Sequence, residues 1–214
     1  ANEGFHGKVW TTPATRDLAQ ILLPDSGHIQ EEDAAFANRK GFSKHAPALP
    51  LYTEDDARRS LKLIRTAAMH KAFEPVPGWT ARFSGAGHIL GAASLLLEVG
   101  GRRILFSGDL GRPDDAIMLA PENPPAADVV VCESTYGDRE HPDENVLAEL
   151  GPALQRVAAR GGTVVVPAFA VGRAQALLHA IAELKAAGTL PSGLPVYLDS
   201  PMAIHSTELF AHHL

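Results

Sequence analysis

Five short apolar segments of the sequence, each with the composition of a buried strand, end in turns of glycine or polar residues. In an open α/β sheet, ligand-binding residues gather at the carboxyl ends of the strands. The sequence therefore predicts an α/β fold with an active site along one rim. The turns expected to form that rim are 85–88, 107–109, 133–135, 169–172 and 199–201.

Helical patterns come before the first of these segments. Pro13 stands at the first position of a helix expected over residues 13–23, and a second helix is expected over residues 28–40, before Gly41. A third helix begins after Thr53, which forms a capping box with the acid three residues later. Its apolar stripe is expected at Ala57, Leu61, Ile64 and Ala68.

From Lys71 onward the segments become too short for helices. Gly100-Gly101 lies between SLLLEV and RRILF and predicts a two-residue hairpin turn. Three further strand candidates, DVVVCE, GTVVVPAF and LPVYLDS, alternate with helices expected near 143–160 and 172–187. Alternating strands and helices favour a mostly parallel sheet in this part of the chain.

Composition narrows the function classes. Apolar residues make up 45% of the 214 residues, which is enough for a core, and no apolar run is long enough for a membrane helix. The first residues lack the pattern of a signal peptide, so the expected location is the cytoplasm. The net charge of −6 lacks the basic signature of many nucleic-acid-binding domains. The single cysteine, Cys132, is expected to be buried and inert.

Two side chains on the predicted rim have the chemistry of metal ligands. His88 follows a Gly-Ala-Gly turn, where an imidazole can bind zinc, act as a base, or serve only as a hydrogen-bonded structural residue. Asp109 follows an apolar strand, and a desolvated carboxylate there would need a partner or a metal; the alternative is a simple turn or capping acid. His205, His212 and His213 have no evident carboxylate partner and are expected at the surface.

Motifs between about residues 85 and 205 resemble those of one enzyme family. GAGHILGAAS followed by ILFSGDLGR resembles the third and fourth motifs of the metallo-β-lactamase fold. CESTYGDREH, VPAFAVGRAQALL and LDSPMA are similar to motifs of the β-CASP nucleases within that superfamily, which include homologues of the mRNA 3′-end cleavage endonuclease. The resemblance implies an α/β chain with a partial αββα metallo-β-lactamase sandwich and the first part of a β-CASP parallel-sheet domain.

The resemblance also implies a chemistry. His88 would bind one of two zinc ions, Asp109 would bridge both, and Glu133 would orient or support a proton-transferring group, unless it is only a capping or ion-paired acid. Arg173 would contact an RNA phosphate through its guanidinium and nearby free backbone amides, or brace the loop. Ser200 would be either a substrate residue or a helix cap. The implied activity is zinc-dependent hydrolysis of phosphodiester bonds in RNA.

The sequence departs from the family in its ligand set. The His-x-His-x-Asp-His cluster and the later histidine motifs do not occur, so the chain is expected to be an internal piece of a longer protein. The expected domains are a partial metallo-β-lactamase domain at 1–136 and a partial β-CASP domain at 137–214. Because a catalytic zinc needs about three protein donors, the piece alone is expected to be inactive. Its unpaired sheet edge predicts self-association.

Three alternatives remain open at this stage. The parent protein is a ribonuclease of the endo or exo type, a nuclease of the same family that acts on DNA, or a silent subunit that binds RNA or a nuclease as a scaffold. A lactamase-fold hydrolase of thioesters or lactams would explain His88 and Asp109 but leave the later motifs without a purpose.

Overall fold

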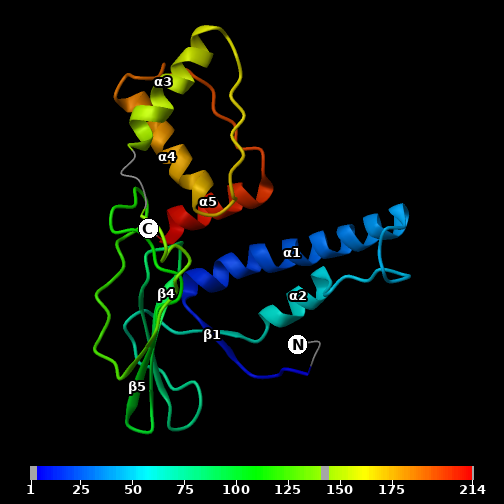
Figure 1. Ribbon diagram of the computed structural model, residues 1–214, viewed down its shortest axis with the longest axis vertical. Coiled ribbons are helices and arrows are strands. Elements are labelled where there is room, and N and C mark those ends of the chain that lie inside the picture. Colours follow the sequence, from blue (N-terminus) through cyan, green and yellow to red (C-terminus); the bar gives the residue numbers. More distant parts are fainter. Residues whose placement is uncertain (1–3, 141–144, 214) are drawn as a thin grey trace.

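The computed structural model describes residues 4–140 and 145–213. It contains a small sheet, a long helix that begins beside one end of the sheet and extends away from it, and a separate helical region (Figure 1). The order is β1 (Val9–Thr11), α1 (Pro13–Lys40), α2 (Glu54–Leu61), β2 (Ile64–Thr66), β3 (Thr80–Gly85), β4 (Ala93–Val99), β5 (Arg102–Phe106), β6 (Val129–Val131), α3 (Val146–Ala159), α4 (Arg173–Ala186) and α5 (Pro201–His213). Helices and strands are thus both present, which agrees with the predicted α/β class.

One long helix, α1, replaces the two helices expected before residue 41. Thr12 caps its first turn by accepting a hydrogen bond from Thr15 N, and Gly41 ends it in a left-handed conformation. Pro24 lies inside the helix although proline removes a backbone donor. Buried residues on both sides of it, Leu18 and Ala37, pack against the rest of the molecule, and this packing outweighs the local penalty.

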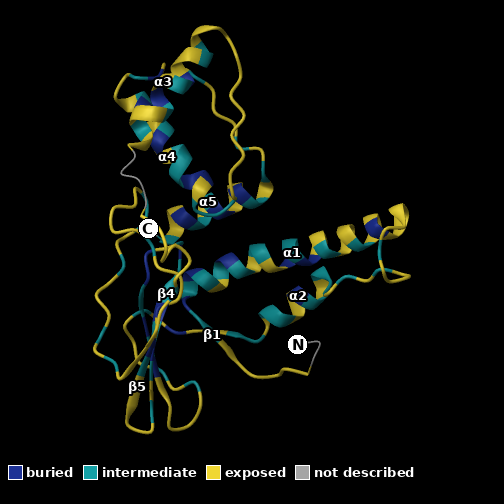
Figure 2. Ribbon diagram, in the orientation of Figure 1, coloured by how far each residue is buried: buried dark blue, intermediate teal, exposed yellow. Residues whose placement is uncertain are grey.

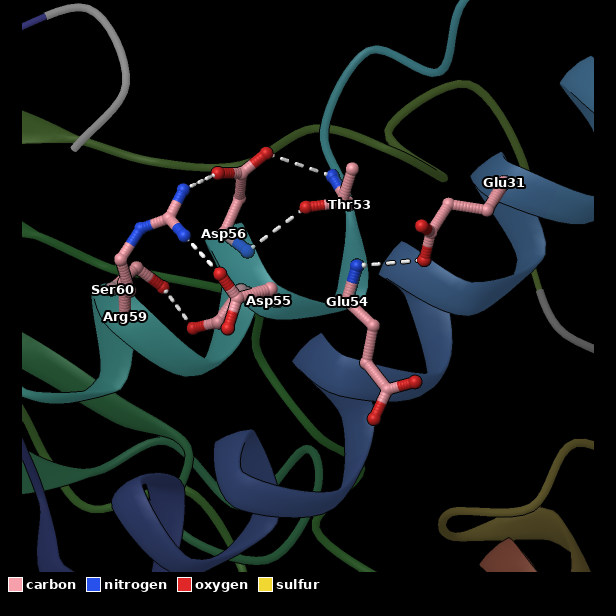
Figure 3. A network of polar contacts seen from close by, with 8 residues as sticks. Glu31, Thr53, Glu54, Asp55, Asp56, Arg59 and Ser60 are labelled. Atoms are coloured by element: carbon pink, nitrogen blue, oxygen red, sulfur yellow. Dashed lines mark hydrogen bonds and ion pairs between the residues drawn. The ribbon is translucent and has the colours of Figure 1, made fainter.

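Helix α2 begins as predicted, at a capping box. Thr53 Oγ1 accepts from Asp56 N at 3.1 Å, and Asp56 Oδ2 accepts from Thr53 N at 2.9 Å (Figure 3). Glu31 of α1 adds a bond to Glu54 N, which joins the two helices. The helix ends at Leu61, so the prediction of a stripe continuing through Ile64 and Ala68 was wrong. Ile64 instead begins β2, which pairs in parallel with β1 through Val9.

The main sheet has the order β3-β4-β5-β6. The pairs β3/β4 and β4/β5 are antiparallel, whereas β5 and β6 are parallel. Gly100 and Gly101 form the turn between β4 and β5 with φ angles of 58° and 75°, the left-handed conformations that a tight hairpin needs. The predicted hairpin is confirmed, and every residue of β6 is exposed (Figure 2).

The expected strands at 162–169 and 194–200 are not present. Both segments lack regular secondary structure, and neither pairs with a strand within residues 4–140 or 145–213. Val165 is 85% exposed and Tyr197 is 86% exposed. A strand depends on hydrogen bonds from a neighbour, and the described part of the chain offers none here. The helices around these segments, α3 and α4, form as predicted because their backbone bonds are internal.

Two small cores hold the molecule together. In one, Leu154, Leu184 and Leu190 pack between α3 and α4. In the other, Phe210 of α5 packs against Ala14 and Leu18 of α1 and against Leu90, which follows β3. The second core joins the helical region to the sheet. Within the described residues, none of the helices has the length and apolar character that would let it cross a membrane.

Candidate functional site

The turn that carries His88 follows β3 and is anchored on the first residues of α1. Thr12 Oγ1 and Thr15 Oγ1 both donate to Gly91 O, at 2.8 and 2.9 Å. Ala86 is fully buried, and its N–H donates to Ala92 O at 3.1 Å, which closes the turn. The side chain of His88 remains exposed. The backbone beneath the imidazole is therefore fixed, while the ring itself is accessible.

The turn that carries Asp109 follows β5 and lies directly against the turn of His88. Gly111 N donates to Ala86 O at 2.8 Å. A Cβ atom on Gly111 would lie 1.8 Å from Gly87 O and 2.7 Å from His88 N, so only glycine allows the two backbones to come this close. The predicted proximity of the two turns is present in the backbone.

Asp109 itself is exposed. The expectation that this carboxylate is desolvated was wrong, because the chain leaves the sheet at Ser107 and the turn extends into solvent. Ser107 is the last buried residue before this turn, and Ser94 Oγ donates a hydrogen bond to its carbonyl at 2.7 Å. The Asp109 carboxylate and the His88 imidazole are thus both accessible, on turns whose backbones are in contact.

Glu133 connects the end of β6 to the turn of Asp109. Its Oε1 accepts from Leu110 N at 2.8 Å, its Oε2 accepts from Thr135 N at 3.3 Å, and its own N–H donates to Ser107 Oγ at 3.0 Å. The hydrogen bonds from Leu110 and Thr135, with a smaller attraction from His88, hold the pKa of Glu133 below its ordinary value. Glu133 is therefore an anchored carboxylate with His88 nearby.

Zinc at a catalytic site needs about three protein donors. Residues 4–140 and 145–213 contain no group of three or more histidine, cysteine, aspartate or glutamate side chains placed to hold one ion. His88 and Asp109 have the right donor chemistry for zinc, an imidazole nitrogen and a carboxylate oxygen, and both are accessible. The described residues thus fit part of a zinc site and do not complete one.

Arg173 begins α4 at a turn that meets the turn of His88. A Cβ on Gly172 would lie 3.6 Å from Ile89 Cγ2, and Val171 packs against the core that contains Leu90. The side chain of Arg173 is exposed. The expectation of free amides at this helix end was wrong for the first three positions. Gly172 N donates to Gln175 Oε1, Arg173 N to Val171 O and Ala174 N to Phe169 O.

Ser200 lies at the start of α5 and accepts from Ala203 N at 3.2 Å, so its hydroxyl is a helix cap. His213, at the other end of α5, contacts Asp17 of α1. Because α5 has 13 residues, its two ends are about 20 Å apart (Figure 1). Ser200 is therefore separated by most of a helix from the end of α5 that meets α1. Its role toward a substrate stays a prediction.

Two other expectations are corrected. Cys132, expected to be buried, is exposed, and so is β6 directly before it. His213 has a carboxylate partner: its Nε2 lies 3.0 Å from Asp17 Oδ2, across 196 positions of sequence. Burial raises the pKa of Asp17, but hydrogen bonds from Arg16 and His213 outweigh it, and the resulting pKa is below the ordinary value.

Sequence reasoning missed three polar residues around the site. Glu122 donates its N–H to Gly85 O, and its carboxylate contacts His70 Nε2 at 2.8 and 2.9 Å. These two residues are 52 positions apart, and no local pattern links them. The third, Gln175, lies at the N3 position of α4, where glutamine often bonds back to the N-cap, so the sequence did carry a signal for it.

Comparisons with known proteins give the family to which the chain belongs. No protein-family model matches the chain. Ribonuclease TTHA0252 of Thermus thermophilus is 33% identical over 97% of the chain, and cleavage and polyadenylation specificity factor 73 of Drosophila melanogaster is 34% identical over 93%. Endoribonuclease YSH1 of Mycosarcoma maydis is 32% identical over 92%. The chain spans 44%, 27% and 21% of these proteins, respectively.

A solved structure of zinc-bound PqqB from Methylobacterium extorquens matches 46% of the chain and 29% of that protein, at 20% identity and a TM-score of 0.25. A match this weak carries no weight for the fold. The relatives, by contrast, align over nearly the whole chain, including the turns of His88, Asp109 and Glu133 and the start of α4. The chain belongs to the β-CASP family of metallo-β-lactamase-fold nucleases.

Proposed function

We propose that this chain contributes one side of the active site of a zinc-dependent ribonuclease, which hydrolyses phosphodiester bonds in RNA by a two-metal mechanism. The observation that carries the proposal is the contact between the two turns of His88 and Asp109, closed by Glu133. The reaction class is supported by the relatives, which are a ribonuclease and an endoribonuclease.

His88 would give an imidazole nitrogen to one zinc ion, and Asp109 would share its carboxylate between two. Zinc bound there supplies Lewis acidity toward phosphate oxygens. Two cations in one site need shared negative charge, which an accessible carboxylate provides. The exposure of both side chains supports this assignment, since both are accessible to a metal ion.

Glu133 would keep the Asp109 turn in place and support proton transfer near His88. Both of its oxygens accept backbone hydrogen bonds, which lower its pKa. Arg173 would contact a phosphate of the RNA through its guanidinium alone, since the adjoining amides are engaged. Ser200 would act on substrate only at a distance from this group, from the start of α5.

The division at about residue 136 into a metallo-β-lactamase part and a β-CASP part is also proposed. The sheet with its turns lies before it and helices α3 to α5 after it. With two donors, the 214-residue chain by itself would be inactive. Zinc measured by elemental analysis on this chain after dialysis is expected below one ion per chain, and two tightly held ions would contradict the assignment.

Self-association of the 214-residue chain is proposed from exposed apolar strand-like residues. Val129, Val130 and Val131 are 48%, 60% and 49% exposed, and Val165 is 85% exposed. Exposed apolar edges favour pairing with another chain. Sedimentation velocity is expected to show species larger than a monomer at micromolar concentration, whereas one sharp monomer peak over a hundredfold concentration range would refute the proposal.

The function is tested on the full-length protein with a labelled single-stranded RNA. Cleavage is expected to stop with a chelator and to return when zinc is added back. His88→Ala and Asp109→Asn are each expected to reduce kcat/KM by about a thousandfold or more, because each removes a metal donor. His45→Ala, at an exposed histidine in the loop after α1, is the matched control and is expected to keep full activity.

Two results would overturn the proposal. RNA binding without cleavage, in the zinc-loaded protein, would favour the silent scaffold. Cleavage of DNA but not of RNA of the same sequence would favour the DNA-directed relative.

A further inference from the structure

Gln175 is a buried side chain of α4 and is 6% exposed. Its amide forms hydrogen bonds both to the turn before α4 and to α5. Its Oε1 accepts from Gly172 N at 2.8 Å, and its Nε2 lies 2.9 Å from Thr207 Oγ1, 3.1 Å from Ala170 O and 3.4 Å from Ala203 O. Buried amides are retained where their bonds are satisfied, and a partner left without its bond costs free energy.

The partners of Gln175 belong to two separate places. Ala170 and Gly172 form the turn that leads into α4, immediately before Arg173. Ala203 and Thr207 are on α5, about 30 positions later. Thr207 Oγ1 in turn donates to Ala203 O at 2.7 Å, so its lone pair is directed toward the amide. One side chain therefore fixes the turn before Arg173 relative to α5.

Helix α5 is itself fixed to the site. Phe210 packs with Leu18 and Leu90, and His213 contacts Asp17. Helix α1 then reaches the His88 turn through the hydroxyls of its first turn, which bond Gly91 O. The contacts run from the His88 turn through α1 and α5 to Gln175 and return to the site at Gly172, beside Ile89.

We propose that Gln175 is a positioning residue for RNA: it holds the turn before α4 so that Arg173 stands beside the His88 turn, where it receives a phosphate of the substrate. This inference rests on the proposed ribonuclease function. An unbonded Gly172 amide would let the first turn of α4 fray, and the guanidinium would lose its fixed place. The expected loss is thus in the use of Arg173 rather than in the chemistry at the metals.

A double-mutant cycle in the full-length, zinc-loaded protein tests this. Gln175→Ala is expected to lower kcat/KM for RNA about tenfold, mainly by raising KM, because a phosphate contact is weakened. In the Arg173→Ala background the same change is expected to cost less than twofold, since its target is already gone. Gln155→Ala is the matched control: Gln155 on α3 also bonds a backbone carbonyl, Thr189 O, and should change kcat/KM less than twofold.

A further variant covers a poorly folded Gln175→Ala protein. Thr207→Val removes one acceptor of the Gln175 amide while keeping the shape of the threonine side chain. It is expected to raise KM by a smaller factor, about threefold, with kcat little changed. An equal loss of kcat/KM with and without Arg173 would overturn the inference.

Amide hydrogen exchange separates the two proposals, because it requires no activity. Gln175→Ala is expected to raise the exchange rate of the peptide containing residues 170–174 at least tenfold, with α3 unchanged. Unchanged protection there would overturn the role of Gln175 even if the protein cuts RNA. If Gln175→Ala loses this protection but the unchanged protein does not cut RNA, Gln175 still positions the turn. The proposed nuclease function, and the role of Arg173 toward RNA, would then be refuted.

Discussion

The sheet region, residues 80–133, and the helical region, residues 145–213, were predicted by the same rules and reach different outcomes. In the sheet region β3, β4, β5 and β6 each have a hydrogen-bonded neighbour. In the helical region α3, α4 and α5 form, but the strand-like segments between them do not pair within the described residues. Helices supply their own backbone partners, and strands depend on distant ones.

Burial separates the same two regions. Leu96 in the middle of the sheet is 3% exposed, whereas Val165 in the unpaired segment 162–169 is 85% exposed. The segments that contain these two residues both have the composition expected of a buried strand. The difference shows that an apolar strand pattern predicts which side chains are suited to burial. Whether they are buried depends on the segments that pack against them.

The largest expected effect is on stability. Leu96→Ala is predicted to lower the free energy of unfolding by about 3 to 4 kcal/mol, because it opens a cavity in the sheet face. Val165→Ala, the matched change in the helical region, is predicted to cost less than about 0.5 kcal/mol. Urea denaturation of both variants measures the two losses in the free energy of unfolding. Equal losses would show that 162–169 is as well packed in solution as β4.

Next in size is the contact between the two site turns. Gly111→Ala is predicted to cost about 2 to 3 kcal/mol, because the new methyl group would overlap Gly87 O and force the turns apart. Gly193→Ala, where a Cβ would meet nothing within 4 Å, is the control from the helical region. Thermal unfolding of the two proteins compares them. A Gly111→Ala protein as stable as the Gly193→Ala protein would disprove the close approach.

The link between the two regions is predicted to depend on pH. The pKa of Asp17 is lowered in the folded chain, so its contribution is present above the unfolded-state value of 3.8 and is lost as the pH falls through the lower native pKa. Asp17→Asn is predicted to cost up to about 1 kcal/mol at pH 7. The cost should shrink as the pH falls below that value.

Urea denaturation at pH 7 and pH 3 makes this measurement, with Asp33→Asn, an exposed position on the same helix, as the control. A pH-independent cost at position 17 would show that the contacts of Asp17 with Arg16 and His213 do not stabilise the ionised carboxylate.

The smallest effect expected at neutral pH concerns Glu133. Its lowered pKa means that its contribution to stability is also present above its unfolded pKa and is lost as the pH falls through the native one. Glu133→Gln is predicted to flatten the acid side of the stability profile more than Glu98→Gln, an exposed change on β4. Parallel pH titrations of the two variants, followed by circular dichroism, make the comparison; identical profiles would contradict the bonds to Leu110 and Thr135.

Local signals in the sequence were sufficient for much of the fold. The capping box at Thr53, the helix end at Gly41 and the hairpin at Gly100-Gly101 all depend on residues within a few positions, and all are confirmed. The errors have a different origin. Pro24 remains inside α1 because of tertiary packing, and residues 162–169 are unpaired because pairing requires a distant strand.

The site could be predicted in part for the same reason. The turns of His88 and Asp109 were expected together because both follow strands of one sheet, and their backbones do meet. The exposure of Asp109 and Cys132, the pair of Asp17 and His213, and the contact of His70 with Glu122 were not foreseen. Each of these features depends on whether segments far apart in the sequence pack against one another.

Metal content of the full-length protein tests most directly whether His88 and Asp109 serve one site. Elemental analysis after dialysis is expected to give two zinc ions per chain for the unchanged protein and for His45→Ala. It is expected to give less than one for Asp109→Ala, which removes the shared carboxylate, and an intermediate loss for His88→Ala. Two retained zinc ions in both the Asp109 and the His88 variant would contradict a common metal site on these two turns.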